Sequence, residues 1–350
     1  MNKLIDIFFV LRIQNQNPER SRIMANAEVT PSNRLIDDRP LISRFPFPFK
    51  GNSYRYSNNS VALQSGNILD ITPEYFEEIE KKRHILNNTH NRSYQSFNHS
   101  LEAQWEILEM VLDEMCKMYP NYFKLEKREN IWFFENYLLN EKEEFMFGDA
   151  STLPYEPLDF IGRHVQEDLV YVAQRDSDLY MDAGQICFPA NWSIAFDLGM
   201  TFTEWHSPVP HFSDSGMSEK VKGFLMRMEA GKPWTRLNWT LTVEPILNTF
   251  PENHHDWGVK KDKITVENVG ELVHLRTEDQ RLFRLPQSNG ILFSIHTYLI
   301  PMKELRKNEK WLQQCHQVLV DLPDYMAEYK GFNSYKDKLI AYLDKEIQAL

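Results

Sequence analysis

The stretch Leu237–Glu244, L-N-W-T-L-T-V-E, decides the fold class of this chain. Every second residue in it is apolar, a period of two that is typical of a strand with one polar or functional face; the apolar residues are Leu237, Trp239, Leu241 and Val243. Before residue 178 the spacing is mostly helical, and after it the alternation dominates. Further strands are predicted around 272–276, 281–285 and 291–298, and their short connections indicate an antiparallel meander.

Helices are predicted on both sides of these strands. The predicted helices are one that starts at Thr72-Pro73 and continues to Leu86, and the segments 101–118, 130–139, 158–172, 311–319 and 336–349. Phe76, Ile79 and Leu86 are expected on one face of the first helix, and the polar segment 87–100 is expected to be a loop. The segment 44–56 is expected to be an arm packed over the core, because its prolines exclude it from a central strand. Helices, then strands, then helices predict an α+β fold.

Composition limits the class of protein. The chain has 350 residues, of which 42% are hydrophobic, which is ample for a sizeable core. A net charge of −11 argues against a nucleic-acid partner. Three well-separated cysteines suit a reducing compartment, and the apolar run 5–13 is too short to span a membrane, so a cytoplasmic protein is expected. We expect residues 1–33 to be a flexible tail and residues 34–350 to form a single domain.

A second stretch, Gly184–Phe212 (G-Q-I-C-F-P-A-N-W-S-I-A-F-D-L-G-M-T-F-T-E-W-H-S-P-V-P-H-F), concentrates aromatic residues around His206. Pro208 and Pro210 favour extended geometry in the residues before them and remove two backbone donors. The chain that follows His206 is therefore expected to be stiff. A stiff, aromatic-rich segment that presents one imidazole could hold a metal or a cofactor.

The motifs of several common enzyme and cofactor classes are missing from the sequence. The sequence contains no H-E-x-x-H, G-x-S-x-G, C-x-x-C, Walker or dinucleotide motif. A pair at helical spacing, His164 and Asp168, is interpreted as a solvated or capping pair rather than as a metal site. A haem pocket needs one neutral imidazole, an aromatic enclosure and cationic groups for the propionates. The candidates for these parts are His206, the aromatic cluster with Phe188 and Trp192, and the arginines Arg236, Arg276 and Arg284; the alternative is a satisfied histidine with structural salt bridges.

Six motifs occur in an order that resembles the haem-dependent oxidative N-demethylase alpha-subunit family, a group of dimethylamine-monooxygenase-like proteins. They are P-L-D-F-I-G-R-H-V-Q-E-D-L-V-Y-V, C-F-P-A-N-W, H-S-P-V-P, R-L-N-W, L-R-T-E-D-Q-R-L-F-R-L-P and L-F-S-I-H-T-Y. The resemblance covers roughly residues 44–305. It implies a PAS-like antiparallel sheet with flanking N- and C-terminal helices that encloses non-covalent haem b. It also implies O2-dependent oxidation of a small methylated amine with release of formaldehyde, using electrons from NADPH that arrive through separate flavin and iron–sulfur subunits.

The resemblance also suggests roles for individual residues. The family's H-x-P-V-P histidine corresponds to His206, which is expected to be the axial ligand of the haem iron. The family's R-x-E-x-Q-x-L-x-R-L-P motif corresponds to Arg276, Glu278, Gln280, Leu282, Arg284, Leu285 and Pro286. We expect Glu278 and Gln280 to act in catalysis, with Glu278 binding the alkylammonium ion, and Trp239 to supply an aromatic face.

The sequence departs from the family's pattern at Asp197-Leu198-Gly199, at His211 and at His296. These departures concern the substrate and the contacts with partners or propionates. Two other interpretations of the chain remain open. It could be a haem-binding PAS-like sensor without turnover, or a degenerate family member that acts without haem.

Overall fold

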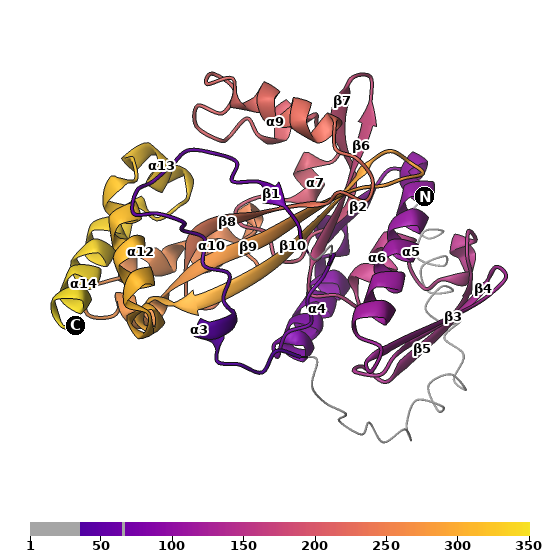
Figure 1. Cartoon of the computed structure of the whole chain (residues 1–350), viewed down its shortest axis with the longest axis horizontal. Coiled ribbons are helices and arrows are strands. Elements are labelled where there is room, and N and C mark those ends of the chain that lie inside the picture. The colour runs from indigo at the N-terminus through magenta and orange to yellow at the C-terminus, as the bar shows by residue number, and fades with distance from the viewer. Residues whose placement is uncertain (1–35, 65–66) are drawn as a thin grey trace, which may run out of the picture.

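The structure is a computed structural model that describes residues 36–64 and 67–350, so the expected tail at 1–33 lies outside the described residues. A seven-stranded antiparallel sheet forms its centre (Figure 1), in the order β1-β8-β9-β10-β6-β7-β2. Its strands are β1 (Val61–Ala62), β2 (Tyr94–Ser96), β6 (Asp168–Arg175), β7 (Asp178–Gln185), β8 (Trp234–Val243), β9 (Val273–Arg284) and β10 (Ile291–Pro301). A smaller antiparallel sheet contains β3 (Phe123–Arg128), β4 (Ile131–Asn136) and β5 (Glu141–Met146).

Helices flank the large sheet, as the predicted α+β class requires. They are α3 (Leu41–Arg44), α4 (Tyr75–Ser93), α5 (Leu101–Met118), α6 (Pro157–Gly162), α7 (Ile194–Asp197), α8 (Phe202–Trp205), α9 (Met217–Met226), α10 (His254–Trp257), α11 (Val269–Leu272), α12 (Glu309–Asp321), α13 (Asp324–Tyr329) and α14 (Lys336–Gln348). Figure 1 shows α12–α14 at one end of the large sheet and the small sheet at the other, with α9 above the strands. The α+β class and the large antiparallel sheet are therefore confirmed.

Most predicted elements are confirmed. The alternating stretch at 237–244 lies in β8, and the stretch at 291–298 lies in β10. The segments 272–276 and 281–285 belong to one continuous strand, β9, which pairs with β10 as a hairpin. The helices predicted at 101–118, 311–319 and 336–349 correspond to α5, α12 and α14.

Two predicted helices are wrong. The segment 130–139 forms β4, whose buried side chains alternate with more exposed ones at the period of a strand. The segment 158–172 is helical only as far as Gly162, because a turn follows and β6 begins at Asp168. Residues 168–173 of β6 are buried on both faces, so their apolar side chains show no alternation, and the spacing imitates a helix.

The N-terminal segments differ from the prediction in detail. The helix predicted from Thr72-Pro73 begins at Tyr75, which is fully buried, whereas Phe76 is 53% exposed and does not share the buried face of Ile79 and Leu86. The loop predicted at 87–100 is wrong, because α4 continues to Ser93 and β2 follows.

The prediction of a packed arm at 44–56 is confirmed. Phe45 and Phe49 are buried, and Phe47 stacks on Trp311 with ring centroids 4.5 Å apart.

The two faces of the large sheet are covered by different layers. On one face an apolar cluster joins β6, β7, β9 and β10 to α7, α8 and α9. The opposite face packs on α4–α6 and the small sheet near β6 and β7. Near β8 and β9 it packs on the arm and the C-terminal helices. Because partners in a strand register share a face, this arrangement decides which polar side chains of β8 and β9 meet under α7–α9.

Candidate functional site

His206 lies directly after the short helix α8. The N-terminus of that helix is fixed by a capping box, in which Thr201 accepts a hydrogen bond from the Glu204 backbone and the Glu204 carboxylate accepts one from the Thr201 backbone. The ring nitrogen Nδ1 of His206 lies 2.9 Å from the carbonyl oxygen of Phe202. Because a carbonyl can only accept, Nδ1 carries the proton and Nε2 keeps its lone pair.

The surroundings of His206 favour a neutral ring. Its centroid lies 4.3 Å from that of Phe202 and 5.0 Å from that of Phe212. Burial lowers the pKa of His206 to about 4; the Phe202 carbonyl acts in the opposite direction, and Arg236 adds to the lowering. The ring is half-buried, and among the described residues no atom is hydrogen-bonded to Nε2. At neutral pH His206 therefore presents an unprotonated nitrogen, which is the form that binds a metal.

Aromatic side chains surround the cluster to which Phe202 and Phe212 belong. Several of them are only partly buried, so that they keep accessible surface beside the cluster: Trp192, Trp205, Phe224, Trp234 and Phe293. They come from the segment that follows β7, from α8 and α9, and from the N-terminal ends of β8 and β10. This region therefore combines an apolar aromatic wall with one free imidazole nitrogen.

Polar groups of β8 and β9 share the face that carries this cluster. Arg236 is the register partner of Gln280, and Asn238 is the partner of Glu278. The Asn238 amide donates to Oε2 of Glu278 at 3.2 Å, and the Gln280 amide donates to the same oxygen at 2.8 Å. The Gln280 Oε1 atom is buried and has no donor in the described part of the chain. The two residues predicted to act in catalysis, Glu278 and Gln280, are thus in direct contact.

The three arginines proposed for a cofactor have different surroundings. Arg276 is fully buried, and its guanidinium donates to the Leu247 carbonyl at 2.6 Å and pairs with Glu278 at 3.3 Å. Arg284 donates to the carbonyl of Leu225, in the last turn of α9, and to that of Met228, just after the helix. Both guanidinium groups are therefore engaged in holding loops and α9 on the sheet.

Arg236 is the exception. Its Nε atom is buried without a partner, and no hydrogen bond or ion pair joins its guanidinium to the described residues. Burial lowers the pKa of Arg236, and the nearby Glu278 carboxylate acts in the opposite direction. Because a partly buried cation whose Nε is shielded from water and has no partner is costly, Arg236 is the arginine that an anionic ligand group would satisfy.

The other predicted residues belong to different hydrophobic clusters. Trp192 packs against the cluster that contains Phe202, whereas Phe188 belongs to the cluster of α4–α6 and gives its carbonyl to Arg276. Trp239 lies on the opposite face of the sheet, where the Lys330 ammonium covers its ring at 4.6 Å from the centroid. Phe196, another aromatic residue of the stretch Gly184–Phe212, is 75% exposed.

Two residues near the site, Tyr329 and Lys330, were not predicted from the sequence. The charges of Arg236 and Glu278 both act on Tyr329 and Lys330, at the end of α13. Burial raises the pKa of Tyr329 to about 12, whereas burial and then Arg236 lower that of Lys330 to about 8. They lie about 90 residues from Arg236 in a helix without a recognisable motif.

The interpretation of His164 and Asp168 as a solvated or capping pair on one helix is wrong, because α6 ends at Gly162 and Asp168 begins β6. Both side chains are buried. His164 lies edge-on to Phe134 at 5.2 Å and beside the amide of Asn136. Asp168 accepts hydrogen bonds from the backbone of Cys187 and Phe188 at 2.9 and 2.7 Å, and so fixes the start of the segment that leads to His206.

A separate cleft of about 160 Å³ lies at the edge of β10, between that strand and the start of α4. His296, one of the departures from the family pattern, lines it and is held by Glu167 at 2.7 Å. Burial raises the pKa of the neighbouring Glu78 to about 7. None of the residues expected to bind a cofactor lines this cleft, so the candidate site is the region of His206.

A family model described as "Haem-dependent oxidative N-demethylase, alpha subunit-like" matches residues 60–340. The chain therefore belongs to this family, as the order of its motifs predicted. Within residues 36–64 and 67–350, no helix combines the length and the apolar character needed to cross a membrane. In the same residues no group of three or more histidine, cysteine or acidic side chains is arranged to hold a metal ion.

The residues of the candidate site fit the haem that the family description implies. An axial ligand requires one neutral imidazole with a free nitrogen, and His206 presents Nε2 while Nδ1 is held by a carbonyl. Propionates require a cation with unused donors, and Arg236 has them. The porphyrin requires an aromatic enclosure, which the partly buried tryptophans and phenylalanines supply.

Proposed function

We propose that this chain is the haem-carrying component of an oxidative N-demethylase that acts on a small, dimethylamine-like amine. The observation that carries the proposal is the neutral, half-buried His206, whose Nδ1 is fixed by Phe202 and whose Nε2 is free. Membership of the family supports haem-dependent oxidative N-demethylation, and the alpha-subunit description implies partner subunits. The large antiparallel sheet with flanking helices would then be a PAS-like fold.

In this proposal the haem is non-covalent haem b, held by His206 through Nε2 and by Arg236 through a propionate. When bound, the haem supplies activation of O2 for oxidation of a methyl carbon. The overall reaction takes the methylated amine, O2, two electrons and two protons, and yields the demethylated amine, formaldehyde and water. Electrons would come from NADPH through flavin and iron–sulfur partner subunits.

The chain's own residues would bind and orient the amine. Glu278 is held in place by Asn238, Gln280 and Arg276, so its carboxylate is fixed before the substrate arrives. The unpartnered Oε1 of Gln280 is an acceptor that an N–H of an alkylammonium ion would satisfy. Glu278 would supply the negative charge and Gln280 the directional hydrogen bond.

Formaldehyde release tests the activity. The purified, haem-loaded protein should release formaldehyde from dimethylamine when NADPH and a flavin and iron–sulfur reductase are supplied. The product should depend on O2 and should be absent for the His206→Ala variant. A panel of mono-, di- and trimethylated amines that yields no formaldehyde, in a protein that shows a haem Soret band, would overturn the demethylase proposal and favour a sensor.

Arg236→Met should separate cofactor binding from folding. Arg236 has no partner to lose, so the free energy of unfolding of the cofactor-free variant should stay within about 1 kcal/mol of the wild type. Haem affinity should fall roughly 10- to 100-fold, the equivalent of about 1.5–3 kcal/mol for one charge-assisted hydrogen bond. Haem titration followed at the Soret band measures the affinity, and urea unfolding measures the stability.

Arg284→Met is the matched control. Arg284 is more buried than Arg236 and donates to the carbonyls at the end of α9, so its loss should destabilise the cofactor-free protein. If Arg236→Met destabilises the protein as much as Arg284→Met does and leaves haem affinity unchanged, Arg236 is a structural residue and its role here is wrong.

A further inference from the structure

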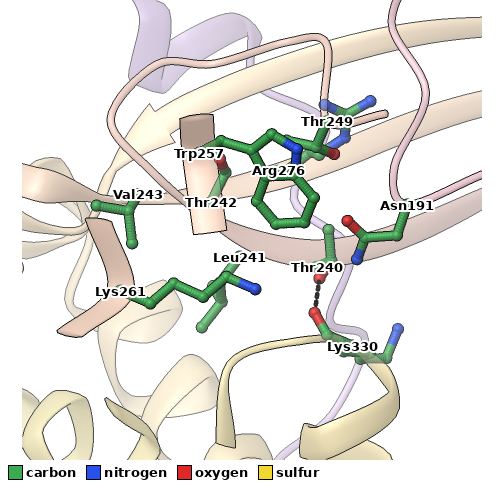
Figure 2. A pocket seen from close by; sticks show the side chains of 10 residues that line it. All are labelled: Asn191, Thr240, Leu241, Thr242, Val243, Thr249, Trp257, Lys261, Arg276 and Lys330. Atoms are coloured by element: carbon green, nitrogen blue, oxygen red, sulfur yellow. Dashed lines mark hydrogen bonds between the residues drawn. The ribbon is translucent and has the colours of Figure 1, made fainter. Parts of the chain in front are cut away.

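A small polar pocket lies farther along the same face of β8. Thr240 and Thr242 follow Asn238 at the spacing of that face, and the pocket is completed by the chain around Asn191, by Thr249, by Lys261 in the 3-10 helix Gly258–Lys263, and by Lys330. Figure 2 shows Lys261 and Asn191 extending into it from opposite sides. Its volume is about 10 Å³, which is the space of a single water-sized sphere.

The charges around this pocket do not balance. Its described lining residues include three cations, Lys261, Arg276 and Lys330, and no carboxylate. The Arg276 guanidinium pairs with Glu278, and the Lys330 ammonium donates to the Trp239 carbonyl at 2.6 Å. For Lys261 no oxygen in the described part of the chain accepts a hydrogen bond; its ammonium only faces the Trp257 ring, 4.7 Å from the centroid. Burial lowers the pKa of Lys261, in agreement with an uncompensated charge.

The donors converge on one point. A Cβ atom on Gly331 would lie 3.0 Å from Nζ of Lys261 and 3.4 Å from the side-chain nitrogen of Asn191. Gly331 has a φ of +77°, which an L side chain rarely adopts, so the chain keeps this point free of a side chain. The hydroxyl of Thr240 donates to the Lys330 carbonyl at 2.9 Å (Figure 2), so its proton is already used.

We infer that this pocket binds a single small anion between Lys261 and Asn191. Its size admits a halide or one carboxylate oxygen. An acceptor at this point would receive hydrogen bonds from the Lys261 ammonium and the Asn191 amide at once. The anion could be a free halide or a propionate of the haem, because Thr240 lies only two residues beyond Asn238 on β8. This site goes beyond the proposed function, and only the propionate source rests on it.

The first arm of the test uses cofactor-free protein. Thermal unfolding is compared in sodium chloride, sodium bromide and sodium gluconate at equal ionic strength, since gluconate is too large for the pocket. The Tm of the wild type should be about 1–3 °C higher in chloride or bromide than in gluconate. In Lys261→Met this difference should vanish, and in gluconate the variant should be at least as stable as the wild type. Lys263→Met, at an exposed position of the same short helix, should keep the difference.

The second arm tests the propionate source. Haem and haem dimethyl ester, whose propionates carry no charge, are titrated into the wild type and into Lys261→Met. If the anion is a propionate, the ester should bind the wild type roughly 10-fold or more weakly than haem does, and Lys261→Met should reduce this difference to the part that Arg236 contributes. A protein that binds no haem leaves the halide result intact and overturns only the proposed function. If neither the halide nor the propionate effect depends on Lys261, the anion site is overturned.

Discussion

His206→Ala is expected to abolish stable haem binding, with affinity reduced roughly 100-fold or more. In the proposed site His206 would hold the haem iron through Nε2, and the substitution removes this nitrogen together with Nδ1, which the Phe202 carbonyl fixes. The fold should survive, because the half-buried ring loses a single hydrogen bond and contacts with Phe202 and Phe212, for about 1–2 kcal/mol in the free energy of unfolding. The Soret band after haem titration measures the first effect, and urea unfolding measures the second.

Two controls make this result specific. His211→Ala removes a neighbouring histidine that contacts Tyr325 and is exposed, so it should keep the Soret band. Imidazole added to His206→Gly should restore a Soret band if the lost group is a ligand, whereas a structural role would not be restored by imidazole in solution. A His206→Ala protein with an unchanged Soret spectrum would rule out the ligand assignment.

The fold was predictable from the sequence where an element buries only one of its faces, because the spacing of its apolar residues then shows whether it is a strand or a helix. β8 packs one face on the core, so its sequence alternates, and α5 buries one side, so its apolar residues recur every three or four positions. β6 is buried on both faces at residues 168–173. Its apolar residues therefore do not alternate with polar ones, and the pattern does not distinguish a strand from a helix. In β4 the aromatic run I-W-F-F has no polar residue between its members, so the alternation appears only in the burial of the side chains.

The candidate site was predictable in part for the same reason. The period of two that identified β8 places Arg236 and Asn238 on one face and Trp239 on the other, so the alternation alone argued against grouping Trp239 with Arg236. The pairing of β8 with β9, which brings Arg236 to Gln280, depends on a long-range register. Lys330 reaches the site through the packing of α13, and no local pattern encodes such a contact.

The difference among the three arginines was also beyond sequence reasoning. Each stands in a strand beside apolar residues, and each was an equal candidate for a propionate. Their roles are decided by loop carbonyls that come from elsewhere in the chain. The Arg284 guanidinium binds the carbonyl of Leu225 in the last turn of α9 and that of Met228 just after it, and the Arg276 guanidinium binds those of Phe188 and Leu247. In the described part of the chain no carbonyl accepts a hydrogen bond from Arg236. The free guanidinium is therefore defined by what the tertiary structure leaves unpaired.

Arg276→Met is expected to cause the largest loss of stability of the substitutions considered. Arg276 is fully buried, and it joins β9 to two loops through the carbonyls of Phe188 and Leu247 while it compensates the charge of Glu278. Removing one partner of a buried ion pair leaves an uncompensated charge, so the free energy of unfolding should fall by about 3–5 kcal/mol. Urea unfolding of the cofactor-free protein gives this value without any contribution from haem.

Measuring Arg276→Met in the Glu278→Gln variant separates the two causes of this loss of stability, the unpaired carboxylate and the lost carbonyl contacts. If the uncompensated Glu278 charge dominates, Arg276→Met should cost at least about 1 kcal/mol less in Glu278→Gln than in the wild type. If the carbonyl contacts dominate, the cost should be the same in both backgrounds, because the loops lose the same donors. An Arg276→Met variant within 1 kcal/mol of the wild type would contradict both accounts. In that case Arg276, like Arg236, would have to be considered available to a ligand, since the fold would not depend on its charge.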